Sequence, residues 1–190
     1  MKTALYPRLA WDGLRKNKRL FLPYLLTCIC MVMMFYILSF LGTEETCALM
    51  PKGSNSTRII LNLGSLVIFV FSAIFLYYTN SFLVRRREHE FGLYNVLGMG
   101  KRNLARIVTW ESLITAALSL GIGLALGILL SKLAELGLMH FTDGEINYRL
   151  RIDGTCVTRT LGLYAVIFAV IWLSTVVRVG RSSAVRLLRS

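Results

Sequence analysis

The residues of this chain that could do chemistry are few, and their spacing does not build a catalytic or metal site. Cys28 and Cys30 stand two residues apart, so a helix would turn them to different faces, and no histidine lies near them to complete a zinc site. The lone His89 stands between Glu88 and Glu90, a setting more typical of a solvated or interface histidine than of a metal ligand. We therefore expect no catalytic residue, no metal and no cofactor.

Gly100 and Lys101 do not form a phosphate-binding loop. That loop needs a second glycine five residues before its Gly-Lys pair and a serine or threonine directly after the pair. Asn95 and Arg102 occupy these two places, and no strand precedes them. A nucleotide site on this chain is therefore not expected.

Glu111 is an acidic residue within an otherwise apolar stretch, directly after Trp110. An ionisable group inside a membrane is costly and is often functional. Three interpretations are open: its side chain reaches the membrane surface, it pairs with Arg106 or Arg178, or it relays protons. The other apolar stretches contain no acidic partner for a relay.

The elements that must position these residues are apolar helices. The chain is 55% apolar and 17% charged, with a mean hydropathy of +0.61, too apolar for an ordinary soluble domain. A helix needs about 20 apolar residues to cross a hydrocarbon core of about 30 Å. Four stretches are long enough, and we predict an all-α membrane protein with four transmembrane helices in the lipid bilayer, at about residues 20–41, 59–84, 107–131 and 161–179.

The basic residues are distributed unevenly between the two sides of this four-span chain. The two termini and the loop between spans two and three hold 16 of the 22 lysines and arginines, whereas the other two loops hold five. The positive-inside rule then places both termini and the middle loop in the cytoplasm. Attraction to anionic lipid headgroups accounts for most of these charges, so the net charge of +12 does not predict a nucleic-acid partner.

Cys47 and Cys156 both fall in loops that this topology places outside the cell. A disulfide between them is conceivable there, but two cysteines in two loops do not decide the question.

The third span carries a ridge of small residues that predicts close helix packing. Small side chains let helix backbones approach each other in lipid, where no hydrophobic effect drives helices together. The ridge either packs against spans two and four of the same chain or forms an interface to a second membrane subunit. Its members recur every four residues: Thr115, Ser119, Gly123, Gly127 and Ser131.

The segment between spans two and three begins with charged residues and continues with apolar ones. A loop this short cannot cover its apolar side chains, so we predict a short cytoplasmic helix that presents an apolar patch for docking. Gly98 and Gly100 would end this helix and allow the chain to reverse into span three.

The run from Tyr77 to Arg106 resembles the cytoplasmic segment of FtsX-like permeases, the membrane subunits of MacB-type ABC transporters. The matching positions are Glu90, Gly92, Leu93, Leu97, Gly98 and Met99. Within that family the chain is most similar to bacitracin-export (Bce-type) antimicrobial-peptide permeases, on the basis of Leu9-Ala10-Trp11, Phe91-Gly92-Leu93-Tyr94 and the basic tail from Ser183 to Arg189.

The resemblance implies a non-catalytic permease subunit in the bacterial cell membrane, coupled to a cytosolic ABC ATPase dimer and serving antimicrobial-peptide resistance or sensing. It further implies a second permease half and a membrane sensor kinase as partners. The residues it implies for ATPase docking are Glu90, Phe91, Gly92, Leu93, Tyr94, Leu97, Gly98 and Met99.

Bce-type permeases have about ten spans and a large extracellular domain, whereas this chain has four spans and short outward loops. Residues 1–190 are therefore expected to be a single FtsX-like unit, as a fragment or split part of a larger permease. Two other functions remain open: a regulatory FtsX-like membrane protein that controls a cell-wall enzyme, and a secondary transporter. Few buried ionisable groups and no paired broken helices argue against the second.

Overall fold

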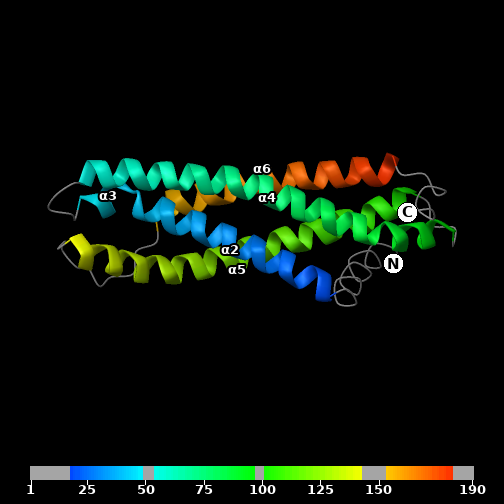
Figure 1. Ribbon diagram of the computed structural model, residues 1–190, viewed down its shortest axis with the longest axis horizontal. Helices are drawn as coiled ribbons and strands as arrows, with labels where there is room; N and C mark the ends of the chain where they lie inside the picture. Colours follow the sequence, from blue (N-terminus) through cyan, green and yellow to red (C-terminus); the bar gives the residue numbers. More distant parts are fainter. Residues whose placement is uncertain (1–17, 49–53, 97–100, 143–152, 182–190) are drawn as a thin grey trace. The chain divides into compact units, whose positions relative to one another are not determined.

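The structure is a computed structural model, and it describes residues 18–48, 54–96, 101–142 and 153–181, with side chains over slightly shorter ranges. Every element in these ranges is a helix (Figure 1): α2 Lys18–Leu41, α3 Glu44–Cys47, α4 Ser54–Val96, α5 Lys101–Thr142 and α6 Gly154–Arg181. Four of them are long and apolar enough to cross a membrane, over Phe21–Leu41, Asn55–Arg86, Asn103–His140 and Gly154–Val179. The predicted all-α fold with four membrane-spanning helices is confirmed.

Lipid explains why these stretches are helical, because only intrahelical hydrogen bonds satisfy the backbone where water is absent. α4 and α5 are longer than the bilayer requires. Their 43 and 42 residues would extend about 65 and 63 Å, against a hydrocarbon core of about 30 Å. Both helices must therefore continue outside the hydrocarbon.

α5 continues beyond the predicted third span, residues 107–131, as far as Thr142. The residues that follow Ser131 are mostly good helix formers. Lys132 also donates to Glu135 three residues later, with 3.1 Å between Nζ and Oε2. α6 likewise begins earlier than predicted, at Gly154, after Asp153 accepts a hydrogen bond from the Thr155 N–H.

The chain folds as two compact units, and each contains a segment of all four long helices. Unit 1 comprises residues 1–27, 75–117 and 165–190, and unit 2 comprises residues 28–74 and 118–164.

The centre of unit 2 is an aromatic contact between α2, α4 and α6. The Phe35 ring lies 5.6 Å from the Tyr164 ring and 6.1 Å from the Phe69 ring, measured between centroids. The Tyr164 hydroxyl donates to the Met31 carbonyl at 2.8 Å and lies 2.9 Å from the Ser72 hydroxyl. Three helices are thus joined by both packing and hydrogen bonds at membrane depth, where polar groups need internal partners.

At the end of α2, in unit 2, the backbone carbonyls accept hydrogen bonds from other parts of the chain. Such carbonyls lack intrahelical partners and need others, most of all near lipid. The donors come from α3, α4, α6 and the turn after α2: Gly42 N to Leu38 O, Cys156 Sγ to Ser39 O, Thr43 N to Phe40 O, Cys47 Sγ to Leu41 O, and Asn62 Nδ2 to Gly42 O. Cys47 and Cys156 are both free thiols in this arrangement, each donating to a different carbonyl of α2.

Candidate functional site

The hairpin formed by the end of α4 and the start of α5 contains the segment singled out in the sequence. α4 ends at Val96 and α5 begins at Lys101. Residues 85–96 continue α4 and do not form a separate short helix. The charged residues that open this segment are good helix formers, so the helix does not break after the apolar stretch.

The predicted docking residues fall at and beyond this helix end. The backbone of Glu90, Phe91, Gly92, Leu93 and Tyr94 belongs to the last turns of α4, whereas their side chains lie outside the described part of the chain. Leu97, Gly98 and Met99 lie wholly outside the described residues. The role of these eight residues in docking stays a prediction.

The base of the hairpin in unit 1 is tied to α6. Val84 on α4, Leu104 and Val108 on α5, and Val179 on α6 form one buried apolar cluster. Two side-chain hydrogen bonds reinforce it: Asn80 Nδ2 donates to Thr175 Oγ1 at 2.8 Å, and Trp172 Nε1 donates to Thr109 Oγ1 at 3.0 Å. Because these contacts join the three helices, a displacement of α4 or α5 here would also displace α6.

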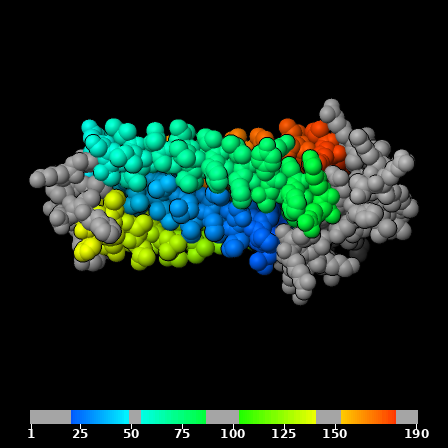
Figure 2. All heavy atoms as spheres, in the orientation of Figure 1, coloured from blue at the N-terminus to red at the C-terminus, as the bar shows by residue number. Residues whose placement is uncertain are grey.

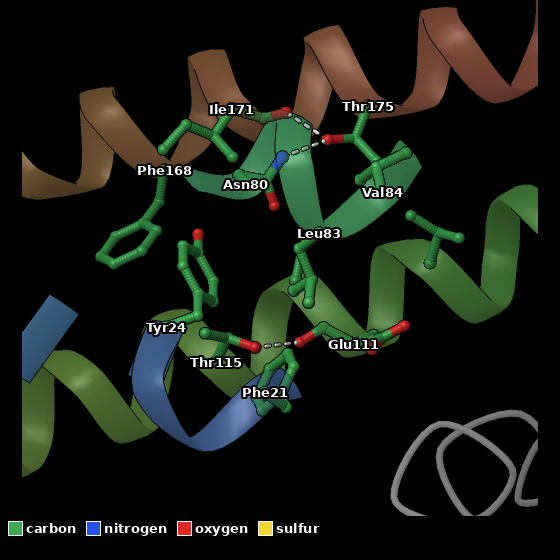
Figure 3. Close-up of a pocket in the computed structure, with 12 residues that line it drawn as sticks. Phe21, Tyr24, Asn80, Leu83, Val84, Glu111, Thr115, Phe168, Ile171 and Thr175 are labelled. Carbon is green, nitrogen blue, oxygen red and sulfur yellow. Dashed lines mark hydrogen bonds between the residues drawn. The ribbon is translucent and has the colours of Figure 1, made fainter. Parts of the chain in front are cut away.

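A small cavity lies next to this cluster in unit 1, and all four long helices line it (Figure 3). Its volume is about 30 Å³, enough for one or two water molecules. The lining is a mixture of aromatic, aliphatic, amide, hydroxyl and carboxyl groups: Phe21, Tyr24, Asn80, Leu83, Val84, Val108, Glu111, Ser112, Thr115, Phe168, Ile171 and Thr175.

Two residues singled out in the sequence, Glu111 and Thr115, lie one turn apart on α5 and line this cavity. Glu111 is buried, with 7% of its surface exposed, and the Thr115 hydroxyl donates to the Glu111 carbonyl at 2.8 Å. Such a site can hold water close to a carboxyl group within the membrane-spanning region. None of the described residues forms a cluster of three metal-ligating side chains.

In unit 2 the small-residue ridge of α5 packs against the first span. A Cβ atom built on Gly123 would lie 2.8 Å from the Val32 Cβ, and one on Gly127 would lie 3.1 Å from the Tyr36 Cδ1. Both of these nearest neighbours are on α2, a span that was not among the neighbours predicted for the ridge within the same chain. Ser119 and Ser131 are also buried. The absence of side chains at Gly123 and Gly127 therefore lets the backbones of α2 and α5 approach each other closely.

Among the residues that the structure describes, two ionisable groups outside the membrane spans have shifted pKa values, both in unit 2. Burial raises the pKa of the Cys47 thiol, and nearby Arg58 opposes this rise only in part. Burial alone would raise the pKa of Asp153, but hydrogen bonds from Thr155 and Cys156 outweigh it and lower the value. The Cys47 thiol is therefore protonated at neutral pH, and Asp153 is ionised.

The polar contacts between the helices were not predicted from the sequence. Asn80, Thr175, Ser72 and Tyr164 lie in apolar stretches, and each forms a side-chain hydrogen bond to another helix. Polar residues within a span are a known sign of such contacts. That sign was present in the sequence, although it does not identify the partners.

Comparison with known proteins gives a family and several relatives. Residues 62–184 match the family profile described as FtsX-like permease C-terminal. The bacitracin export permease protein BceB of Bacillus subtilis (strain 168) is 25% identical over 178 residues, which cover 93% of this chain and 27% of BceB.

Two further relatives give the same coverage pattern. The ABC transporter permease YvcS of Bacillus subtilis (strain 168) is 22% identical over 175 residues, 92% of this chain and 27% of YvcS. BceB of Halalkalibacterium halodurans is 24% identical over 163 residues, 86% of this chain and 25% of that protein. The chain thus spans about a quarter of the length of these relatives.

Proposed function

Because this chain belongs to the FtsX-like permease family, we propose that it is the membrane part of an ABC transporter permease that couples a cytosolic ATPase to helix movement. Proteins of this family are non-catalytic membrane subunits, and the chain is a multi-pass protein of the bacterial cell membrane with four helices long enough to span it. ATP hydrolysis would then belong to the partner.

The observation that carries the proposal is the unbroken course of α4. The apolar part of this helix extends to Arg86, and the helix continues to Val96. Residues 87–96 add about 15 Å at 1.5 Å per residue. A continuous helix transmits a push or a rotation from its end into the membrane better than a flexible loop would.

We place the ATPase contact at the tip of this hairpin. Apolar side chains there would sit in a groove of the ATPase, as in other helix-in-groove contacts. The proposed docking residues are Glu90, Phe91, Gly92, Leu93, Tyr94, Leu97, Gly98 and Met99.

The base of the hairpin supports a path from this tip into the bundle. Val84, Val108 and Val179 are buried together, and the Asn80–Thr175 hydrogen bond joins α4 to α6 directly. Movement of the hairpin would then reposition α6 in unit 1 and change the shape of the adjacent cavity.

Orientation is proposed from charge. Four basic residues of unit 1 lie close to the ends of the apolar stretches of α4, α5 and α6: Arg85, Arg86, Arg106 and Arg178. The positive-inside rule would place this end, the hairpin tip and both termini in the cytoplasm, where an ATPase is available.

The cargo and the wider assembly are proposed from the relatives. Two of them are named bacitracin export permeases, which supports a role in resistance to, or sensing of, bacitracin-like peptides. We propose that residues 1–190 act as one FtsX-like unit together with further permease sequence, an ATPase dimer and a membrane sensor kinase.

The test is co-purification of the ATPase with detergent-extracted variants of this chain. Leu97→Asp should lose the ATPase, because a charge in an apolar contact is costly to bury, whereas Leu97→Met should retain it. Membrane insertion of both variants should be normal, since residue 97 lies outside the spans. Full recovery of the ATPase with Leu97→Asp would refute the docking assignment.

A further inference from the structure

Arg85 and Arg86 stand out among the charged residues of unit 1. Both side chains are exposed on α4. Within the described part of the chain, no acidic side chain lies at ion-pair distance from either of them. Two neighbouring guanidinium groups with no acidic side chain of the described residues beside them are able to bind an anion.

Arg86 is held in a defined place on the helix surface. Its guanidinium carbon lies 4.8 Å from the centre of the Phe82 ring. Such cation–π stacking is favourable and limits the rotamers of the arginine. The stacked guanidinium still presents its N–H groups at its edge, where they can bind an oxyanion in a bidentate manner.

The surface next to this site on α4 is apolar and uncovered. Phe75, Tyr78 and Phe82 recur at helical spacing toward Arg86 and are 41%, 70% and 56% exposed. In Figure 2 the coloured part of α4 that leads up to residue 86 lies at the surface on the face in view. A ligand that fits the whole surface must combine an anionic group with a long apolar tail.

We propose that Arg85 and Arg86 bind the phosphate of an anionic phospholipid whose acyl chain lies along Phe82, Tyr78 and Phe75. The positions of these residues across the bilayer support a phospholipid as the ligand. Tyr78 and Arg86 are about 12 Å apart along the helix axis. That distance takes the surface from the hydrocarbon into the headgroup layer, which is roughly 5–7 Å thick on each side. The methylene groups of the arginine side chains can lie along the apolar surface while the guanidinium groups reach the phosphate.

A lipid fits this surface better than an acidic face of a protein. The aromatic row belongs to Asn55–Arg86, the stretch of α4 that is long and apolar enough to cross a membrane. An ATPase in the cytosol could reach the guanidinium groups but not the apolar row below them. The inference is independent of the proposed function, since it requires only that α4 crosses a bilayer.

The test is retention of phosphatidylglycerol by the purified full-length chain. The protein is placed in phosphatidylcholine nanodiscs with a minor fraction of phosphatidylglycerol, and the lipid that stays bound after release into detergent is counted by native mass spectrometry. A basic residue near an anionic surface contributes about 1 kcal/mol, or about fivefold in binding. The double variant Arg85→Ala, Arg86→Ala should therefore lose roughly 25-fold in preference for phosphatidylglycerol.

Two further variants sharpen the result. Arg58→Ala is the matched control, because Arg58 is an arginine at the opposite end of α4 that already pairs with Glu44 at 2.7 Å; it should retain phosphatidylglycerol like the wild type. Arg86→Lys keeps the charge but loses the planar guanidinium, so we expect an intermediate preference.

Four outcomes would overturn the lipid site. One is equal retention of both lipids by the wild type, and another is unchanged phosphatidylglycerol preference in the double variant. The third is loss of ATPase co-purification by the double variant with lipid preference intact, which would assign the arginines to the ATPase. Displacement of the lipid by soluble glycerol phosphate would mean that the apolar row contributes nothing, and it would also contradict the proposal.

Discussion

The close approach of α2 and α5 in unit 2 gives a prediction with a built-in control. Gly123 faces α2, and a Cβ there would lie 2.8 and 2.9 Å from the Cβ and Cγ1 of Val32 and 3.1 Å from the Ile29 carbonyl oxygen. A β-branched side chain and a backbone carbonyl cannot move aside easily. Gly121 lies two residues away on the same helix, and a Cβ there would meet no atom within 4 Å.

The expected magnitude follows from comparing the two alanine variants. Each gains the same helix propensity, up to about 1 kcal/mol per glycine replaced, so this contribution cancels in the difference. Overpacking a tight contact costs about 1–3 kcal/mol. Gly123→Ala should therefore be less stable than Gly121→Ala by about 1–3 kcal/mol. Gly127→Ala should fall between them, because its closest contacts are 3.1–3.3 Å from the Tyr36 side chain.

The assay is reversible unfolding of the purified chain in mixed micelles, followed by helical circular dichroism as the fraction of denaturing detergent rises. The free energy of unfolding is compared among the three alanine variants and the wild type. Equal stability of Gly123→Ala and Gly121→Ala would refute the reasoning, because it would mean that α2 does not lie in close contact with α5 at Gly123.

Three further predictions concern unit 2 and the topology. Tyr164→Phe removes the donor to the Met31 carbonyl and should lower the free energy of unfolding by about 0.5–1.5 kcal/mol, whereas Tyr78→Phe, at a tyrosine 70% exposed, should change it little. The lowered pKa of Asp153 means that its stabilising contribution is complete at neutral pH and is lost as the pH falls through that lowered value; Asp153→Asn should therefore be less stable at neutral pH and less sensitive to acid, and an unchanged acid profile would contradict this. In a cysteine-free background, thiols at Ser54 and Gly144 should react with an impermeant reagent from outside and one at Gly98 should not, and reversed labelling would refute the proposed orientation.

The four long apolar helices could be predicted from the sequence, but not how far each one extends beyond its apolar stretch. Long apolar runs must be helical in lipid, which identifies four spans regardless of how they pack. The part of α5 after Ser131 carries Lys132 and Glu135, which hydropathy assigns to a loop. In the structure these two residues pair along the helix and are largely buried, so the helix continues where the hydrophobic signal stops.

The packing of the ridge was only half predictable. Glycines at four-residue spacing indicate close approach of another helix, and Gly123 and Gly127 do make such an approach. The identity of the neighbour depends on how four helices arrange themselves in the bilayer, which local spacing does not encode. The same limit applies to the unit 1 cavity, because Asn80, Glu111 and Thr175 come from three different helices.

The central claim is that the hairpin between α4 and α5 contacts a cytosolic ATPase. The most direct measurement is photo-crosslinking in native membranes, with a photoreactive amino acid at Tyr94 near the end of α4 and, as a control, at Ile60 near its beginning, where the side chain is 68% exposed. The account predicts a crosslinked adduct with the ATPase from position 94 and none from position 60. An adduct from position 60, or no ATPase adduct from positions 91, 94 and 97 in a membrane that contains the ATPase, would contradict it.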